Sequence, residues 1–466
     1  MSAPTLKRSL GLGFAIVVVI ANIVGSGVYK KVAPMAAELH SSGWILIAWL
    51  LAGIITLFGA LCNAEVAGLL ADTGGEYSYF KKIYNRFFAF IFGWSLFTVI
   101  QTAAISSLAY VFAQSFNNIV HLPPLLTSWA NFNIMGIFYP FADFNIKLIA
   151  IIIIILLSWV NTKGIKAGAE VSTTILVLVF AGIFTIIVFG LTSAQADVSR
   201  LKMETTNGST VNVSNIFTAM LAAFWGYHGW ASVGYIGGEI KDSNRNIPKG
   251  ISIGVFIIIG LYLLVNTTYL LLASVPQLEA IYNGKTQIAA VEAVRSFWGE
   301  RGALFISVLI VVTTLGCCNA SILSGCRPIY AMAREGLFFA SAARLTKKLA
   351  PGNALWYQCV WAAVLVLSGS FDQLTDMIIF AVFIYFGATT LGVFILRKKM
   401  PHAKRPYKVW GYPIVPAIFI LFCVALVFNT VFSRPREAGI GVALMLTGVP
   451  MYWWFKKRYV QNEEDN

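Results

Sequence analysis

Long apolar stretches, each bounded by polar or charged residues, recur along all 466 residues of the chain. A helix needs about 20 mostly apolar residues to cross the hydrocarbon core of a bilayer. Twelve stretches approach or exceed this length, which predicts an all-α polytopic membrane protein with twelve transmembrane helices. They lie near residues 10–35, 43–70, 87–114, 146–160, 171–192, 215–237, 250–274, 302–330, 355–370, 374–396, 413–432 and 438–455.

Glycines interrupt the first and the sixth of these stretches. The first contains Gly25-Ser26-Gly27, and the sixth contains Gly226 and Gly229. A glycine inside a helix costs about 1 kcal/mol relative to alanine and lets the backbone leave helical geometry. Inside a membrane, unwound backbone is tolerated only where it faces protein or a water-filled cavity, and paired interruptions point to a transporter's binding site. We therefore predict that both helices are broken around one substrate site.

The placement of the two breaks also predicts how the chain is organised. Spans one to five and spans six to ten would form a five-plus-five inverted repeat. The expected parts are a cytoplasmic N-terminus at 1–9, the first repeat at 10–200, the second repeat at 201–400, spans eleven and twelve at 401–455, and a cytoplasmic tail at 456–466. The two halves share no obvious residue-level identity, so the repeat is inferred from the breaks and the topology.

Composition agrees with a membrane protein, because only 12% of the residues are charged and 58% are hydrophobic, whereas soluble domains carry about 25% charged residues. The net charge of +14 is explained by basic cytoplasmic loops rather than by a nucleic-acid partner. Most lysines and arginines fall on one side if the N-terminus is cytoplasmic. We expect both termini inside, in the plasma membrane or a bacterial inner membrane. Lys30 and Lys31 are exceptions, since this topology places them outside.

The six cysteines lie in or at the ends of predicted spans, and none forms a Cys-x-x-Cys pattern. We interpret them as small apolar packing residues and expect no metal site and no cofactor. An intramembrane enzyme would need paired acidic groups, a Ser/His pair or a metal at depth. His228 is the only histidine within a predicted span, so the sequence does not favour an enzyme.

The unwound backbone of the two breaks suits both ends of an α-amino acid. The half-helix that follows Gly25-Ser26-Gly27 would offer unpaired N–H groups and a positive dipole end to a carboxylate. The half-helix before it would end in free carbonyls around Ile23, which accept hydrogen bonds from an ammonium group. The second break would repeat this with the carbonyls of Trp225 and His228, beside Gly229. The alternative is a packing motif, in which small residues let helices approach closely.

Side chains near the breaks are candidates for a gate and a pocket. Trp225 lies beside the second break, where its ring could close over a ligand. Three roles stay open for His228, namely a wall of the pocket, a proton carrier, or a neutral histidine hydrogen-bonded to a neighbour. Glu65 and Glu239, at the expected cytoplasmic ends of spans two and six, could form an inner gate of ion pairs, or they could be solvated loop charges.

Five groups of residues form motifs that follow one another along the chain. They are Gly25-Ser26-Gly27, Gly74-Gly75-Glu76-Tyr77, Trp225 to Trp230 with Gly238-Glu239-Ile240 and Asn246-Ile247-Pro248, Tyr330 to Gly336, and Arg405-Pro406-Tyr407-Lys408 with Gly411-Tyr412-Pro413. Together they resemble motifs of the amino acid–polyamine–organocation superfamily, above all of its L-type amino-acid transporter branch and bacterial relatives. The similarity covers nearly the whole chain.

The resemblance implies amino-acid transport by alternating access, without covalent chemistry. At positions that match the family's motif, Ile23, Gly25, Ser26 and Gly27 would hold the backbone of the substrate. Trp225 would be the aromatic gate. The partners implied are an amino-acid substrate and the lipid bilayer, and an accessory subunit stays unknown.

Two positions depart from the family's pattern. Many relatives carry a lysine in span five at a position that falls near Val179 here, so coupling to protons or to sodium stays open. His228 stands where close relatives often have glycine, and its bulk would shrink the pocket or change its polarity. We therefore expect a preference for small or polar neutral L-amino acids.

Two other functions stay open as alternatives. A polyamine or organic-cation carrier of the same fold would be supported by anionic pocket residues, and spans one and six contain none. A channel would need a continuous polar lining or a selectivity ring.

Overall fold

The structure is a computed structural model that describes residues 10–70, 75–134, 138–163, 166–284, 288–347 and 350–464. The side chains of 166–176, 235–239 and 459–464 are outside this description. The expected N-terminal segment 1–9, Gly74 of the second motif and the side chain of Glu239 therefore lie outside the described part. Within the described ranges the chain is helical, with two isolated β-bridges and no longer strand. The predicted all-α class is confirmed.

The helices follow one another along the chain as the apolar pattern predicts. They are α1 (Leu12–Ile23), α2 (Gly27–Lys30), α3 (Val32–Leu39), α4 (Ser42–Leu69), α5 (Glu76–Ile83), α6 (Arg86–Ser95), α7 (Gln101–Val120), α8 (Phe144–Thr162), α9 (Lys166–Leu191), α10 (Val213–Tyr227), α11 (Ser243–Leu272), α12 (Val275–Gly284), α13 (Ala289–Arg334), α14 (Gly352–Ser368), α15 (Phe371–Lys399), α16 (Ile414–Ser433), α17 (Pro435–Leu446) and α18 (Gly448–Glu464). Short π or 3-10 segments are η1 (Leu96–Ile100), η2 (Thr127–Trp129), η3 (Val198–Arg200), η4 (Trp230–Glu239) and η5 (Ala340–Ala343).

Eight helical segments of the described chain are long and apolar enough to cross a membrane. They are Ser42–Leu69, Arg86–Val120, Phe144–Thr162, Ser243–Leu272, Ala289–Arg334, Phe371–Lys399, Ile414–Ser433 and Pro435–Arg458. Three shorter apolar helices, Leu12–Ile23, Val177–Leu191 and Gly352–Ser368, match further predicted spans. The predicted sixth span is divided into α10 and η4. A polytopic membrane fold is thus confirmed, whereas the count of twelve spans and the inverted repeat stay predictions.

Both predicted helix breaks are present. α1 ends at Ile23, Val24 adopts an extended conformation with ψ of 96°, and helical structure resumes at Gly27. In the sixth span, α10 ends at Tyr227 and His228 is extended with ψ of 147°. Gly229 then takes φ of +116°, a left-handed conformation that only glycine adopts without strain. Each break therefore lies at the point that the sequence indicates, and a left-handed glycine shapes the second one.

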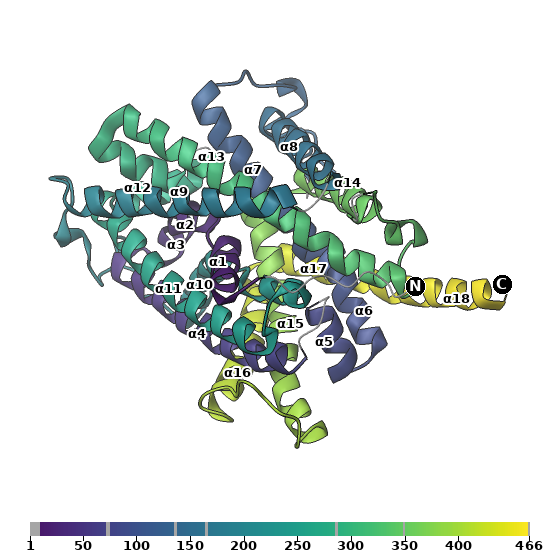
Figure 1. The fold of residues 1–466 in the computed structure, drawn as a ribbon. Helices are drawn as coiled ribbons and strands as arrows, with labels where there is room; N and C mark the ends of the chain where they lie inside the picture. Colours follow the sequence, from purple (N-terminus) through teal and green to yellow (C-terminus); the bar gives the residue numbers. More distant parts are fainter. Residues whose placement is uncertain are drawn as a thin grey trace.

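The broken helices lie inside the bundle rather than at its edge. α1 appears near the centre of the view in Figure 1, and it packs against α11, η4, α9 and α13. α12 lies at the upper left, while α5, α6 and α18 lie toward the right. We call these two ends of the bundle the α12 end and the α5 end. The central placement of α1 lets its break face helices from both halves of the chain.

Candidate functional site

The two breaks face a single small cavity, which we call the central cavity. Its volume is about 40 Å³, and a single ordered water needs roughly 10–15 Å³ by the same measure, so the space suits a small ligand. Its lining consists of Asn22, Ile23, Gly25, Ser26, Gly27, Gln101, Ala104, Leu108, Trp225, His228, Gly229, Ser232, Cys317 and Ser321. The structure thus brings together all seven residues that the sequence proposes for substrate binding, and their role in binding stays a prediction.

Glycine is required where the two breaks touch. A Cβ atom on Gly27 would lie 2.5 Å from the Cα atom of Gly226, closer than two carbon atoms tolerate. A Cβ atom on Gly229 would overlap the backbone oxygen of Asn22. The two segments come from positions about two hundred residues apart in the sequence, and only the absence of side chains lets their backbones meet.

Trp225 connects the two breaks and lines the cavity. Its indole Nε1 donates a hydrogen bond to Ser26 Oγ at 3.2 Å. Its ring stacks on His228, with centroids 6.0 Å apart and planes at 16°, and it meets Phe371 edge-on at 6.1 Å. Phe371 is the first residue of α15 and lies near Tyr282 of α12. The ring of Trp225 therefore lies between the central cavity and the α12 end of the bundle. The role of Trp225 as an aromatic gate stays a prediction.

His228 forms part of the wall of three cavities. Besides the central cavity, it lines a space of about 30 Å³ toward Phe92 and Tyr385, and one of about 10 Å³ beside Phe383. Its Nδ1 atom is buried without a hydrogen-bond partner among the described residues. A buried polar atom without a partner costs about 1–3 kcal/mol, so Nδ1 is a group that a ligand could satisfy.

Gln101, from the third predicted span, completes the polar part of the cavity wall. Its Nε2 donates to the backbone oxygen of Ser321 at 2.9 Å, and both residues line the central cavity. The π-helical segment η1 immediately precedes Gln101, and such π turns often occur at functional sites because they shift side chains out of helical register. Its partner lies 220 positions away in the sequence, so this contact is visible only in the fold.

A wider cavity of about 460 Å³ lies at the α12 end, and we call it the vestibule. Lys30, Tyr282, Phe371 and Arg434 are among its lining residues. The ammonium groups of Lys30 and Lys31 lie 4.6 and 4.7 Å from the centre of the Phe371 ring, within the range of cation–π attraction. Because Trp225 meets the same Phe371 ring, this aromatic pair separates the vestibule from the central cavity.

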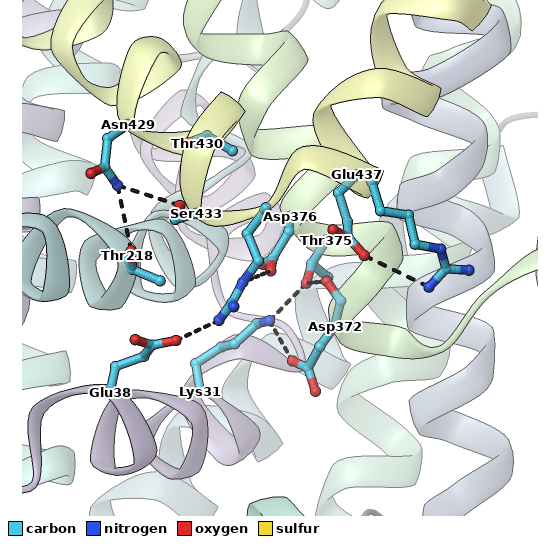
Figure 2. Close-up of polar contacts among 12 residues, drawn as sticks. Lys31, Glu38, Thr218, Asp372, Thr375, Asp376, Asn429, Thr430, Ser433 and Glu437 are labelled. Atoms are coloured by element: carbon cyan, nitrogen blue, oxygen red, sulfur yellow. Dashed lines mark hydrogen bonds and ion pairs between the residues drawn. The ribbon is translucent and has the colours of Figure 1, made fainter. Parts of the chain in front are cut away.

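Ion pairs around Lys31 and Arg434 lie beside the vestibule, whose lining includes Asp372, Asp376 and Arg434. Figure 2 shows Lys31 Nζ between Asp372 and Thr375, at 2.7 Å from each partner oxygen, and only 1% of the Lys31 side chain is exposed. Arg434, between α16 and α17, pairs with Glu38 of α3 at 2.5 Å and with Asp376 of α15 at 3.5 Å. We call these five charged residues the α12-end network. It joins the second half of the first broken helix to α15.

The predicted topology places Lys30 and Lys31 outside, whereas most other basic residues lie inside. Contacts within the protein explain this exception. Neither is a solvated loop charge, since Lys31 is paired inside the protein and Lys30 Nζ donates to Gln114 Oε1 at 2.7 Å. Sequence reasoning missed the roles of Asp372 and Arg434. The signal that could have found them was the pair of lysines on the unexpected side, because buried cations in membrane proteins need acidic partners.

At the α5 end, Glu65 lies in a second ion cluster. Its carboxylate accepts from Arg397 Nε and Nη2 at 2.9 and 2.7 Å, and from the backbone N–H of Val409 at 2.7 Å. Arg405 Nε lies 3.5 Å away, and only 3% of the Glu65 side chain is exposed. Glu65 is therefore not a solvated loop charge. It ties α4 to α15 and to the segment that leads into α16, and its role in a gate stays a prediction.

Val179, the position at which many relatives are expected to carry lysine, is buried in α9 with 2% of its surface exposed. An apolar side chain at this position supplies neither a charge nor a ligand for a cation. Whether transport is coupled to protons or to sodium therefore stays open.

Comparison with known proteins finds relatives that match nearly the whole chain. The family model described as "Amino acid permease" matches residues 10–455. The chain is 31% identical to the serine/threonine exchanger SteT of Bacillus subtilis (strain 168), over 97% of this chain and 98% of that protein. It is 29% identical to the large neutral amino acids transporter small subunit 2 of Mus musculus, over 96% of this chain and 81% of that protein.

A third similar protein is also named as an amino acid transporter. The b(0,+)-type amino acid transporter 1 of Homo sapiens is 26% identical, over 97% of this chain and 88% of that protein. These matches run through both broken helices and the membrane-spanning segments on either side of them. The chain belongs to the amino acid permease family.

Proposed function

We propose that this permease is a secondary active transporter of small or polar neutral L-amino acids. It would work by alternating access in the plasma membrane, or in the inner membrane of a bacterium. Both termini would be cytoplasmic, so the α12 end faces outside and the α5 end faces inside. The observation that carries this proposal is the meeting of two unwound backbone segments around one small cavity.

The first break would hold the carboxylate of the substrate. Gly25, Ser26 and Gly27 line the central cavity at the start of the second half-helix, where N–H groups lack partners within the helix. Backbone donors of this kind bind carboxylates without a cationic side chain. The lining of the cavity includes no lysine or arginine among its described residues, which fits recognition by backbone.

Carbonyl groups of both breaks would hold the ammonium group. The carbonyl of Ile23 ends α1, and the carbonyl of Trp225 accepts a hydrogen bond from the N–H of His228 at 3.2 Å. A carbonyl oxygen has two lone pairs, so each of these groups can accept a second donor. An α-amino acid carries both a carboxylate and an ammonium group, so it would satisfy the N–H groups and the carbonyls together. An organic cation would leave the carboxylate-binding N–H groups without a partner.

The names of two relatives indicate which amino-acid side chains the substrate would carry. One similar protein is named as a serine/threonine exchanger, and another as a transporter of large neutral amino acids. The small volume of the central cavity and the bulk of His228 favour the smaller end of this range. Gln101 and Nδ1 of His228 would offer polar partners to a short hydroxylated side chain.

The experiment that tests the proposed function is uptake of radiolabelled neutral amino acids into liposomes that contain the purified protein. Each amino acid would be supplied with and without internal amino acid, a sodium gradient and a proton gradient. Uptake that needs only internal amino acid establishes an exchanger, and uptake driven by one gradient establishes a symporter. Absence of uptake under all conditions, with ion flux instead, would contradict the proposal and favour a channel.

His228→Gly is expected to broaden selectivity toward large side chains. His228 lines the central cavity and two smaller spaces, so its removal would join them into one pocket that extends to Phe383 and Tyr385. A hydrophobic pocket discriminates about 10- to 200-fold per methylene that it cannot hold. We expect uptake of L-leucine relative to L-serine to rise by about tenfold or more. A variant with the selectivity of the unaltered protein would show that His228 does not set the size limit.

Lys31→Gln is expected to favour opening toward the vestibule. It removes the charge that holds Asp372 of α15 against the first broken helix. Labelling of Cys317, which lines the central cavity, by a membrane-impermeant thiol reagent applied from outside should rise by about tenfold, equivalent to 1.4 kcal/mol. Cys317→Ser identifies the labelled thiol, and Lys202→Gln, at an exposed lysine, serves as the charge control. Equal labelling of both lysine variants would speak against the network as a gate.

A further inference from the structure

A groove opens on the surface of the bundle between α14, α15 and α17, and we call it the lateral groove. Its volume is about 390 Å³, within the range of about 300–1,000 Å³ that is usual for ligand pockets. Its lining residues include Trp361 and Val364 of α14, Met377 of α15, and Ile440 and Leu444 of α17. Val364 is 46% exposed, so the groove is open to the outside of the bundle. This mostly apolar lining suits an apolar chain rather than a polar solute.

The polar groups of the lateral groove gather at one end. Arg436 and Glu437 lie in the first turn of α17 and line the groove there. Ile440 and Leu444 follow Arg436 at steps of four residues, on the same face of the helix. At 1.5 Å per residue, Leu444 lies about 12 Å from Arg436 along the helix. The segment Pro435–Arg458 is long and apolar enough to cross a membrane, so Arg436 lies near the membrane surface and Leu444 in the hydrocarbon region. The headgroup and the acyl chain of a lipid follow one another in the same order.

An aromatic surface next to the groove places its polar end at the membrane interface. Phe138 and Pro140, from the segment that precedes α8, also line the groove. In the same segment, Trp129, Phe132 and Tyr139 expose 54%, 46% and 43% of their surfaces. Exposed aromatic side chains of this kind are typical of the headgroup level of a bilayer. The polar end of the lateral groove therefore lies where lipid headgroups are found.

Two charges of opposite sign stand at this polar end. Nη1 of Arg436 lies 3.8 Å from Oε1 of Glu437, which is longer than a hydrogen bond. A guanidinium carries five N–H donors and a carboxylate about four acceptor sites, so this contact uses only part of their capacity. A phosphate accepts strong hydrogen bonds from a guanidinium, and a primary ammonium donates them to a carboxylate. Phosphatidylethanolamine carries both a phosphate and a primary ammonium.

The lining favours a flexible chain over a transmembrane helix of another protein. Helices associate in membranes through small residues that let their backbones approach closely. Along the apolar part of the lateral groove the side chains are large, as at Trp361, Met377 and Leu444, and Gly369 follows directly after α14. A lipid chain, which rotates freely about its bonds, follows such a surface more readily than a rigid helix does.

We infer that the lateral groove binds one phosphatidylethanolamine molecule, with its phosphate at Arg436, its ammonium group at Glu437 and an acyl chain between α14 and α17. This site goes beyond the proposed function and does not depend on which solute the protein carries. Gln373, Arg436 and Glu437 line both the lateral groove and the vestibule. The bound headgroup would therefore lie at the rim of the vestibule.

The test is native mass spectrometry of the purified full-length protein with phosphatidylethanolamine, phosphatidylcholine and phosphatidylglycerol of identical acyl chains. We expect one saturable site that binds phosphatidylethanolamine about tenfold more tightly than the other two lipids. The quaternary ammonium of phosphatidylcholine has no N–H donor for Glu437, and phosphatidylglycerol has no cationic group.

Two charge variants test the headgroup contacts. Arg436→Gln is expected to weaken binding of all three lipids by about tenfold, because each carries the phosphate. Glu437→Gln should lower the affinity for phosphatidylethanolamine alone, to that for phosphatidylcholine. The charge control is Arg301→Gln, at an exposed arginine of α13 that lines neither the groove nor the vestibule. It should bind all three lipids as the unaltered protein does.

Two size variants test the place of the acyl chain. Val364→Trp would fill the groove, and we expect it to weaken binding of all three lipids by about tenfold or more. Val360→Trp places the same side chain one turn earlier in α14, at a residue that is 63% exposed and does not line the groove. It should leave binding within about twofold. Size-exclusion chromatography checks that each variant is folded.

Several results would overturn the inference. Equal binding of the three lipids without saturation would show only the general lipid contact of a membrane protein. Equal losses in Val360→Trp and Val364→Trp would place the lipid elsewhere, and an unchanged headgroup preference in Glu437→Gln would remove the assigned ammonium contact. A dimer that Val364→Trp dissociates would assign the groove to a second copy of this chain.

Discussion

Gly27→Ala and Gly229→Ala are each expected to reduce amino-acid uptake by roughly 5- to 150-fold, the range that corresponds to 1–3 kcal/mol. The added methyl group on Gly27 would lie 2.5 Å from the Cα atom of Gly226, so the two breaks would have to separate. Overpacking of this kind costs about 1–3 kcal/mol. Gly229 adds a second penalty, because alanine is strained at φ of +116° and would also overlap the backbone oxygen of Asn22.

Gly13→Ala is the control for this prediction. Gly13 lies in the same helix as the first break, α1, and an added Cβ atom there meets nothing within 4 Å. Alanine should be neutral or slightly stabilising at such a site. Uptake would be normalised to the amount of folded protein, measured by size-exclusion chromatography. If Gly27→Ala and Gly229→Ala transport as well as Gly13→Ala, the close contact of the breaks has no part in transport.

Glu65→Gln is expected to lower the thermal stability of the protein strongly. The carboxylate of Glu65 is almost fully buried and faces the guanidinium groups of Arg397 and Arg405. Arg405 is itself only 6% exposed, so removal of the negative charge leaves it without its acidic partner. Loss of one member of a buried ion pair costs about 3–5 kcal/mol, and we expect the apparent melting temperature in detergent to fall by several degrees.

The matched variant is Glu300→Gln. Glu300 pairs with Arg295 at 3.0 Å, but 84% of its side chain is exposed, and such a surface pair contributes only about 0–1 kcal/mol. Its melting temperature should equal that of the unaltered protein. A fall that is equal in both variants would contradict the structural role of the Glu65 cluster. If Glu65→Gln instead changes access to the cavity without a loss of stability, the cluster acts as the inner gate that the sequence predicts.

The sequence predicts the helices well because the bilayer imposes their length. About 20 apolar residues are needed for each crossing, and the described helices follow the apolar stretches closely. The breaks are equally visible, because clustered glycine in the middle of an apolar span weakens the helix at that point. Gly25-Ser26-Gly27 and Gly229 lie where the chain leaves helical geometry.

The sequence does not predict contacts between distant parts of the chain. Lys31 and Asp372 are 341 residues apart, and nothing in their local sequence indicates that they form a pair. The lateral groove depends in the same way on how α14 and α17 lie beside each other. His228 was recognisable as unusual, whereas its place in the wall of three cavities follows only from packing.

The central claim is that the two breaks recognise the carboxylate and the ammonium group of one small zwitterion. The most direct measurement is inhibition of labelled L-serine uptake in liposomes by L-serine and by two analogues, ethanolamine, which lacks the carboxylate, and glycerate, which lacks the ammonium group. We predict that L-serine inhibits strongly and that each analogue is at least about tenfold weaker, the cost of about 1.4 kcal/mol for one unpaired set of backbone groups. Inhibition by ethanolamine as strong as that by L-serine would contradict this claim and identify a carrier of organic cations.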